Sequence, residues 1–218
     1  MNTGIMIVDD HPLVREGLIT LISNQRDFCL SGEASGIAEA RELVRQTHPD
    51  VVIVDLTLKD GNGITLIKEL KEQYEGIKVL ALSMHDETVF AERALRAGAS
   101  GYVSKHEASR TIIQAIRTVL DDKLYLSERM MNRVLSRAVG SKQRQSPEQH
   151  SPVERLSNRE IEIFEMIGRG LTSRQIAQQL DLSQRTVDTH RENIKDKLEL
   201  KNAVELTKHA VQWVLENH

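Results

Sequence analysis

The chain lacks the features that mark secreted, disulfide-linked and membrane-spanning proteins. It has one cysteine among 218 residues, so no internal disulfide can form, and we interpret Cys29 as a small core residue in a reducing compartment. No apolar run reaches the roughly eighteen residues that a membrane span needs. The first ten residues contain no basic side chain and end on two acids, which is not the pattern of a signal peptide. We therefore expect a cytoplasmic protein with no membrane partner.

Aromatic residues and net positive charge are also scarce. Phe, Trp and Tyr make up 3% of the chain, so the cores must be built from aliphatic residues, which suits helices packed on a sheet. The formal net charge is -3, so the whole-chain charge predicts neither a nucleic-acid nor a membrane surface. A content of 39% hydrophobic and 28% charged residues is typical of globular proteins. The length suits two domains of ordinary size.

In the first half, five apolar runs alternate with five helical patterns. The expected strands are residues 4–8, 29–34, 51–54, 77–83 and 101–104, and the expected helices are residues 12–23, 37–46, 64–74, 87–97 and 108–120. Strict alternation of strands and helices favours right-handed crossover connections and a parallel sheet. The pattern therefore predicts an α/β domain with a doubly wound, flavodoxin-like sheet of five strands.

The second half contains helical patterns only. A further helix is expected over residues 121–137, and the following stretch AVGSKQRQSPEQHSP has the composition of a linker. Helical patterns then cover residues 157–168, 172–180, 183–198 and 203–216. We predict three parts: an α/β domain over residues 1–121, a linker helix and flexible linker over 122–151, and a small all-α domain of four helices over 152–218.

Polar residues stand where the expected strands end. Asp9 and Asp10 follow the first strand, Asp55 ends the third, Ser83 ends the fourth, and Lys105 follows the fifth. A single Asp after a strand is more often a turn former or a helix cap. Here, however, all five positions fall on the edge where parallel sheets bind ligands. Clustered carboxylates favour a divalent cation, and an oxygen-only donor set suits Mg²⁺. The set predicts a site that places a phosphoryl group on the third-strand carboxylate.

Residues 5 to about 120 resemble the receiver domain of two-component response regulators. The resemblance is carried by the segments IVDDHPLVREGL, VVIVDLTLKDGNG, VLALSMHD and GASGYVSK. It implies that Asp55 accepts a phosphoryl group from a sensor histidine kinase. It also implies a metal set for Mg²⁺ (Asp9 through water, Asp10, Asp55 and the backbone carbonyl of Thr57) and a phosphate-binding and switch set (Ser83, Tyr102 and Lys105).

The chain departs from the receiver pattern in the loop after Asp55. Lys59 stands where the family commonly has proline, and Leu58 where it frequently has methionine. We therefore expect a less rigid loop than usual. Because no residue of the expected site is missing, phosphorylation is expected to remain possible.

The stretch GLTSRQIAQQLDLSQRTVDTHRENIKDKL predicts a helix-turn-helix. Thr172 or Ser173 would cap the first helix and Ser183 the second, with a tight turn between them. The second helix has an apolar face of Val187, Ile194 and Leu198, and its other faces are polar. From the pattern alone, an ordinary helical hairpin is the commoner interpretation.

Residues from about 156 to 213 resemble the LuxR-type DNA-binding domain, on the segments LSNREIEIFEMI, GLTSRQIAQQL and TVDTHRENIKDKL. The two domains in this order resemble the NarL/FixJ class of response regulators. The resemblance implies that the helix over residues 184–197 enters the major groove of double-stranded DNA. It also implies that the last helix, near Val211 and Val214, supports a homodimer when the protein is phosphorylated.

We expect the DNA contacts to lie mainly on that reading helix, with Arg185, Thr186, Arg191 and Lys195 as the preferred ones. The candidate positions are Thr172, Arg185, Thr186, Asp188, Thr189, His190, Arg191, Asn193 and Lys195. Acidic side chains cannot approach phosphate cheaply, but they can accept from cytosine. The pattern leaves open whether His190 faces the core or a phosphate.

The charge of the helical half bears on how DNA binding would be controlled. From Glu154 to the end, ten basic residues stand against eleven acidic ones. A domain without net positive charge should bind phosphates weakly as a monomer, and a dimer would about double the contacts. We therefore interpret the chain as a transcription regulator that phosphorylation controls by forming the dimer.

Two other classes of function stay open. One is an enzyme, a magnesium phosphohydrolase that works through a phosphoaspartate. Such enzymes usually carry a general acid two residues beyond the nucleophile, where this chain has Thr57, so we expect no enzyme. The other is a module whose helical half binds a protein instead of DNA.

Overall fold

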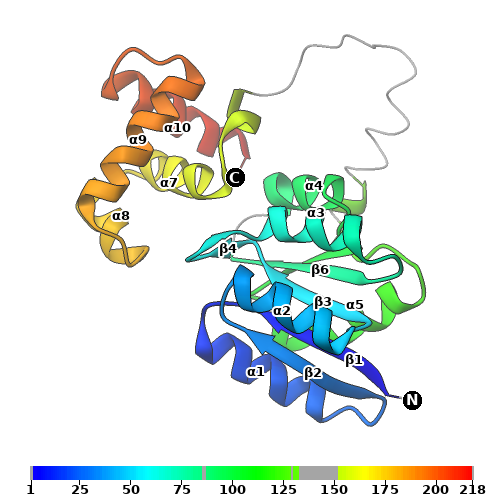
Figure 1. Ribbon diagram of the computed structural model, residues 1–218. Coiled ribbons are helices and arrows are strands. Elements are labelled where there is room, and N and C mark those ends of the chain that lie inside the picture. Colours follow the sequence, from blue (N-terminus) through cyan, green and yellow to red (C-terminus); the bar gives the residue numbers. More distant parts are fainter. Residues whose placement is uncertain (1, 85–86, 129, 133–151, 218) are drawn as a thin grey trace. The chain divides into compact units, whose positions relative to one another are not determined.

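A computed structural model describes residues 2–84, 87–128, 130–132 and 152–217 (Figure 1). It divides the chain into two compact units, Met1–Arg144 and Gln145–His218. Among the described residues, no helix is long and apolar enough to cross a membrane.

The first unit is built on a five-stranded parallel sheet (Figure 1). Its strands are β1 (Thr3–Val8), β2 (Phe28–Ala34), β3 (Val51–Asp55), β6 (Lys78–Ser83) and β7 (Gly101–Ser104), in the order β2-β1-β3-β6-β7. Every residue of β3 is buried, which is why that strand is an unbroken run of Val and Ile before its acid. From β1 the chain continues to β2, which pairs with one edge of β1, and then to β3, which pairs with the other edge of β1. The order thus reverses between β1 and β3, where open sheets form their ligand crevice.

Helices cover both faces of this sheet, as the doubly wound prediction requires. They are α1 (Pro12–Ser23), α2 (Ile37–Thr47), α3 (Gly63–Gln73), α4 (Glu87–Arg96) and α5 (Ala108–Leu120). Helices α1 and α5 pack together on one face, over a core that includes Ile5, Ile53, Leu80, Ile112 and Ile116. Helices α2, α3 and α4 lie on the other face. The predicted α/β fold class is confirmed, but the interpretation of Cys29 as a core residue is wrong, because this side chain of β2 is exposed.

A short antiparallel hairpin, which the sequence did not predict, follows β3. Its strands are β4 (Thr57–Leu58) and β5 (Gly61–Asn62). Strands of two residues show no periodicity, so a pattern search cannot find them. Gly63 closes the hairpin against β3, because a Cβ at this position would collide with the backbone oxygen of Asp55. At the tip, Asp60 Oδ2 accepts a hydrogen bond of 2.7 Å from the backbone N–H of Ile37, at the start of α2.

The helix predicted over residues 121–137 begins later than expected. The chain after α5 first runs along the edge strand β7, where Tyr125 bridges to Gly101 and Tyr125 O accepts from Tyr102 N at 2.9 Å. This pairing satisfies backbone groups that an open sheet edge would leave exposed. Helical structure appears at residues 128 and 130–132. The rest of the predicted linker, residues 133–151, lies outside the described residues, and the boundaries at 121 and 152 stay predictions.

In the part of the second unit that the structure describes, the elements are helical, as expected. They are η1 (Pro152–Arg155), α7 (Asn158–Gly168), α8 (Ser173–Gln179), α9 (Gln184–Leu198) and α10 (Ala203–Asn217). Side-chain caps set the helix starts: Ser157 and Glu160 form a capping box on α7, and Thr172 and Gln175 form another on α8. Ser183 caps α9. The helix-turn-helix therefore begins and ends where its local sequence predicts.

Candidate functional site

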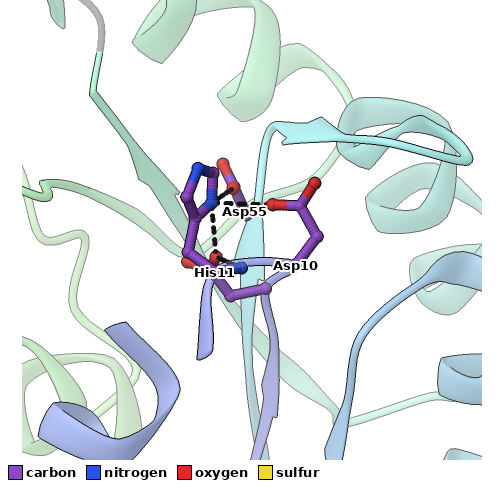
Figure 2. Close-up of side chains that lie close together, drawn as sticks. Asp10, His11 and Asp55 are labelled. Atoms are coloured by element: carbon purple, nitrogen blue, oxygen red, sulfur yellow. Dashed lines mark hydrogen bonds and ion pairs between the residues drawn. The ribbon is translucent and has the colours of Figure 1, made fainter. Parts of the chain in front are cut away.

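Three aspartates and a histidine meet at the carboxyl edge of the sheet, where β1 and β3 end. Figure 2 shows Asp10, His11 and Asp55 of this group. One donor atom from each of Asp9, Asp10, His11 and Asp55 lies within 4.8 Å of the other three. Asp9 is fully buried and Asp55 is 2% exposed. The sequence predicted that the three acids lie close together, because parallel strands place their carboxyl ends at one edge of the sheet. It did not include His11.

Lys105 lies inside this cluster and is shared by two carboxylates. Its Nζ is 2.7 Å from Asp9 Oδ2 and 2.7 Å from Asp55 Oδ2, and its side chain is only 4% exposed. The backbone sets this position, because Lys105 N donates to Ser83 O at 2.8 Å, one residue beyond the β6–β7 pairing. The ammonium is therefore held by the sheet itself rather than by a mobile loop.

Burial decides the protonation chemistry of the site. It raises the pKa of the Asp55 carboxyl to about 6; Lys105 opposes the increase and the negative charge of Asp9 adds to it. Burial by itself would lower the pKa of Lys105, but the carboxylates of Asp55 and Asp9 outweigh it, and the pKa is raised. At neutral pH the lysine is charged and cannot compensate all three aspartates. The remaining negative charge, shielded from water, favours a bound cation.

Each carboxylate oxygen of Asp10 lies close to another polar group. Oδ1 is 2.7 Å from His11 Nδ1, and Oδ2 accepts a hydrogen bond of 3.1 Å from the backbone N–H of Lys59. A proline at position 59, common in the receiver family, has no N–H and could not make this bond. The loop that we expected to be less rigid thus forms a hairpin with tethers to Asp10 and to α2.

Of the other predicted receiver residues, Thr57 contacts Asp55, Ser83 ends the neighbouring strand β6, and Tyr102 lies on β7. Thr57 N donates to Asp55 Oδ1 at 3.0 Å, while the buried Thr57 Oγ1 has no hydrogen-bond partner among the described residues. Ser83 is fully buried, and the Tyr102 ring, 2% exposed, already lies inside the protein. The metal-binding role of the Thr57 carbonyl and the switch roles of Ser83 and Tyr102 stay predictions.

The candidate DNA contacts are spread over two sides of α9. Arg185, Thr186, Asp188, Thr189 and Asn193 are exposed, whereas His190, Arg191 and Lys195 are half-buried. Several of them have local partners: Lys195 Nζ is 2.7 Å from Glu192 Oε2, and Thr189 Oγ1 donates to Arg185 O at 3.0 Å. Thr172, off this helix, is exposed but its side chain serves the cap of α8. The exposed set gives α9 a polar outer face of the kind that a reading helix needs.

His190 has the surroundings of a neutral side chain. Burial lowers its pKa, and the positive charges of Arg159 and Lys197 lower it further, against the opposite effect of Glu160. Its Nδ1 is buried and has no hydrogen-bond partner among the described residues. A neutral imidazole attracts phosphate less than a charged one, so these surroundings favour the core-facing alternative.

The two candidate dimer residues differ in their placement on α10. Val211 is 38% exposed, whereas Val214 is half-buried and lies over Gly168 of α7, where a Cβ would meet its side chain. Two exposed residues of the same helix were missed: Val204 and Leu215, each 78% exposed. Val204, Val211 and Leu215 are spaced by seven and four residues, which places them on one side of the helix. This spacing was readable from the sequence.

Two family models match the chain. A model of the response regulator receiver domain matches residues 5–117, and a model of the bacterial regulatory proteins of the luxR family matches residues 154–210. The oxygen regulatory protein NreC of Staphylococcus carnosus (strain TM300) is 32% identical over 209 residues, which cover 95% of this chain and 96% of NreC.

Solved structures also resemble this chain. A LuxR-family two-component response regulator from Aurantimonas sp. SI85-9A1 is 35% identical, with a TM-score of 0.59, over 64% of this chain and 99% of that one. The RcsB response regulator of Salmonella typhimurium, in a structure concerned with conformational dynamism for DNA interaction, is 25% identical, with a TM-score of 0.56, over 95% of this chain and 97% of RcsB. Both units of the chain therefore have relatives of known fold, in the same order.

Proposed function

This chain belongs to the two-component response regulators that join a receiver domain to a LuxR-type DNA-binding domain, and we propose that Asp55 is the residue through which phosphorylation controls it. Membership makes the protein a phosphorylation-controlled transcription regulator that binds DNA. One observation supports Asp55 in particular. It ends the strand between β1, which supplies Asp9, and β6, which supplies Ser83, and Lys105 Nζ lies 2.7 Å away. Asp55 is therefore next to Asp9 and Lys105, on the strand that pairs with the one ending at Ser83.

The phosphoryl donor is a phosphohistidine of a sensor kinase. A carboxylate oxygen of Asp55 attacks phosphorus and the P–N bond breaks. The electron pair returns to the ring nitrogen of the donor, which takes up a proton, and an aspartyl phosphate remains. Lys105 already sits beside the attacked carboxylate, so its ammonium can bind a transferred phosphoryl oxygen without moving far. The Ser83 hydroxyl binds a second. Because Tyr102 is already buried, phosphorylation changes what its ring contacts rather than burying it.

Mg²⁺ is the cation that the site would hold. Asp9, Asp10, Asp55 and the Thr57 carbonyl offer oxygen donors, and the excess negative charge beside Lys105 calls for a dication. When bound, Mg²⁺ neutralises the acids and the charge that develops on the phosphoryl oxygens. Asp10, held by the backbone N–H of Lys59, is in place to bind it.

The output is DNA binding by a dimer. Helix α9 enters the major groove, with Arg185, Thr186, Arg191 and Lys195 as the preferred contacts, and the exposed apolar side of α10 at Val211 joins two copies. The helical half carries no net positive charge, so one copy alone should bind DNA weakly. We place the protein in the cytoplasm, where its DNA and its kinase partner would be accessible.

A matched pair of variants tests this proposal. Asp55→Asn removes the acceptor, and Asp122→Asn makes the same change at a side chain that is 80% exposed on the same unit. With acetyl phosphate and Mg²⁺, wild type and Asp122→Asn should gain one phosphoryl group by intact-mass measurement, dimerise, and bind promoter DNA at least about tenfold more tightly. Asp55→Asn should do none of these. An Asp55→Asn protein that binds DNA as tightly as phosphorylated wild type would overturn the proposal.

The two alternatives make different predictions. We propose no enzyme activity, and sustained turnover on small phosphate esters would contradict that. DNA retardation before and after the double change of Arg191 and Lys195 to Ala tests a protein-binding role for the helical unit. Complete loss of retardation, with the fold retained by circular dichroism, supports the DNA-binding assignment.

A further inference from the structure

His11 occupies a capping position without acting as a cap. It is the N-cap residue of α1, followed by Pro12, and its side chain makes no capping hydrogen bond. The ring turns instead into the acidic site (Figure 2). Its Nδ1 is 2.7 Å from Asp10 Oδ1, 3.1 Å from Asp9 Oδ1 and 3.9 Å from Asp55 Oδ2. A ring nitrogen thus stands among the oxygens that the receiver fold offers to a cation.

These separations are those of donor atoms that share one metal ion. In an octahedral site with bonds of about 2.1 Å, neighbouring donors lie about 3 Å apart and opposite donors about 4 Å apart. The distances from Nδ1 to Asp10 and Asp9 match neighbours, and that to Asp55 lies near the wider spacing. A hydrogen bond accounts only for the contact with Asp9 Oδ1. Asp10 Oδ1, the nearest of the three oxygens, has no hydrogen-bond partner among the described residues.

The surroundings of Nδ1 also include a positive charge. Lys105 Nζ lies 3.5 Å from it, so an ammonium and three carboxylates all approach the same ring atom.

We propose that His11 Nδ1 is an additional metal ligand, and that it raises the affinity of this site for the borderline dications Mn²⁺, Co²⁺ and Zn²⁺ far more than its affinity for Mg²⁺. The proposal rests on the proposed function, because it concerns the same metal site. Imidazole nitrogen suits first-row transition ions, whereas Mg²⁺ prefers oxygen and keeps several waters. Carboxylates alone discriminate less strongly between these ions than a site that includes an imidazole, so most of the selectivity should depend on His11.

Metal binding by the full chain without a histidine tag tests the proposal. Free Mn²⁺ is measured by electron paramagnetic resonance, and Mg²⁺ by competition with it, for wild type, His11→Ala and His209→Ala. His209 is an exposed histidine of the other unit and serves as the control. His11→Ala should bind Mn²⁺ at least about tenfold more weakly, while its affinity for Mg²⁺ stays within about twofold. Equal losses for the two ions, or no loss, would overturn the proposal.

Pulsed resonance on bound Mn²⁺ gives a readout that does not depend on a variant. Wild type and His209→Ala should show the coupling of an imidazole nitrogen, and His11→Ala should lose it. If wild type binds Mg²⁺ and is phosphorylated but shows no nitrogen coupling, only the present proposal fails and His11 is a hydrogen-bond partner of the acids. If neither ion binds wild type, the metal site of the proposed function fails as well.

Discussion

Each unit of this protein contains a buried acid next to a lysine, and the pKa values of the two acids are shifted in opposite directions. Asp55 is 2% exposed and the Glu160 side chain 4%, and each has a lysine Nζ at 2.7 Å. Yet the pKa of Asp55 is raised to about 6, whereas the pKa of Glu160 is lowered. Both acids have a lysine partner, but Asp55 and Lys105 lie deeper in the protein than Glu160 and Lys197, so the cause lies in depth and in the other neighbours.

The number of donors for each acid explains the difference. Burial raises the pKa of both carboxyls. Glu160 overcomes this because Lys197 donates to both of its oxygens, at 2.9 and 2.7 Å, and the Ser157 backbone adds a third hydrogen bond. Asp55 shares its lysine with Asp9, whose negative charge acts against it.

The comparison separates a structural ion pair from a functional one. In the helical unit, the ion pair between Lys197 and Glu160 joins α9 to the start of α7, and the pair carries no net charge. In the receiver unit, the charges are kept out of balance at the sheet edge, and such imbalance is typical of sites that bind or react. Four predictions test this difference.

Lys105→Met should have the largest effect on stability. It leaves Asp9 and Asp55 buried without their shared cation, and uncompensated buried charges destabilise by about 3–5 kcal/mol. Urea unfolding in EDTA can be followed by tyrosine emission, because all three tyrosines lie in the receiver unit. The control Lys123→Met, at a side chain that is 72% exposed, should change the free energy of unfolding by less than about 1 kcal/mol. Similar losses of stability in the two variants would contradict the stabilising role of the buried Lys105.

Asp55→Asn should stabilise the receiver unit in the absence of metal. The raised pKa means that the folded state binds more protons than the unfolded state between about pH 4 and 6, so the stability of wild type falls as pH rises through that window. Removing the charge should raise the free energy of unfolding by about 1–3 kcal/mol at pH 7. The gain should shrink on acidification and vanish near pH 4. A variant less stable than wild type at pH 7 would show that the ionised Asp55 carboxylate does not destabilise the folded receiver unit.

Lys197→Met, the same change in the helical unit, should destabilise by only about 1 kcal/mol. The Lys197 side chain is 41% exposed, so water screens the pair, and Glu160 keeps the N–H of Ser157. Trp213, the one tryptophan, packs on Phe164 and reports unfolding of this unit. Because the pKa of Glu160 is lowered, the contribution is present above about pH 4.5 and is lost as pH falls below it. A loss of stability as large as that for Lys105→Met would show that the two ion pairs do not differ in this way.

Lys59→Pro should have the smallest effect, on metal affinity. It removes the backbone N–H that holds Asp10, a hydrogen bond that contributes about 0.5–1.5 kcal/mol. The affinity for Mg²⁺ in calorimetry should therefore fall by up to about tenfold. Lys59→Ala keeps the N–H and should bind Mg²⁺ like wild type. If both variants weaken binding equally, the side chain matters and the backbone bond does not.

Much of this architecture was predictable from local pattern. Runs such as VVIV are buried strands because nothing polar interrupts them, and Ser157, Thr172 and Ser183 start helices because their side chains satisfy the first free N–H groups. Parallel topology then brought Asp9, Asp55 and Lys105 to one edge, since strand direction alone decides where strands end. These features depend on periodicities and caps a few residues long, so one sequence suffices to find them.

Contacts between distant residues were decided only by the tertiary structure. No local rule pairs Lys197 with Glu160, 37 positions away, or Lys59 N with Asp10, 49 positions away. Nor does any local rule turn His11 into the acidic cluster or bring Asp60 to the start of α2. The signs of the two pKa shifts likewise depend on burial and on how many donors converge in space, because electrostatic energy follows distance through the fold and not separation along the chain.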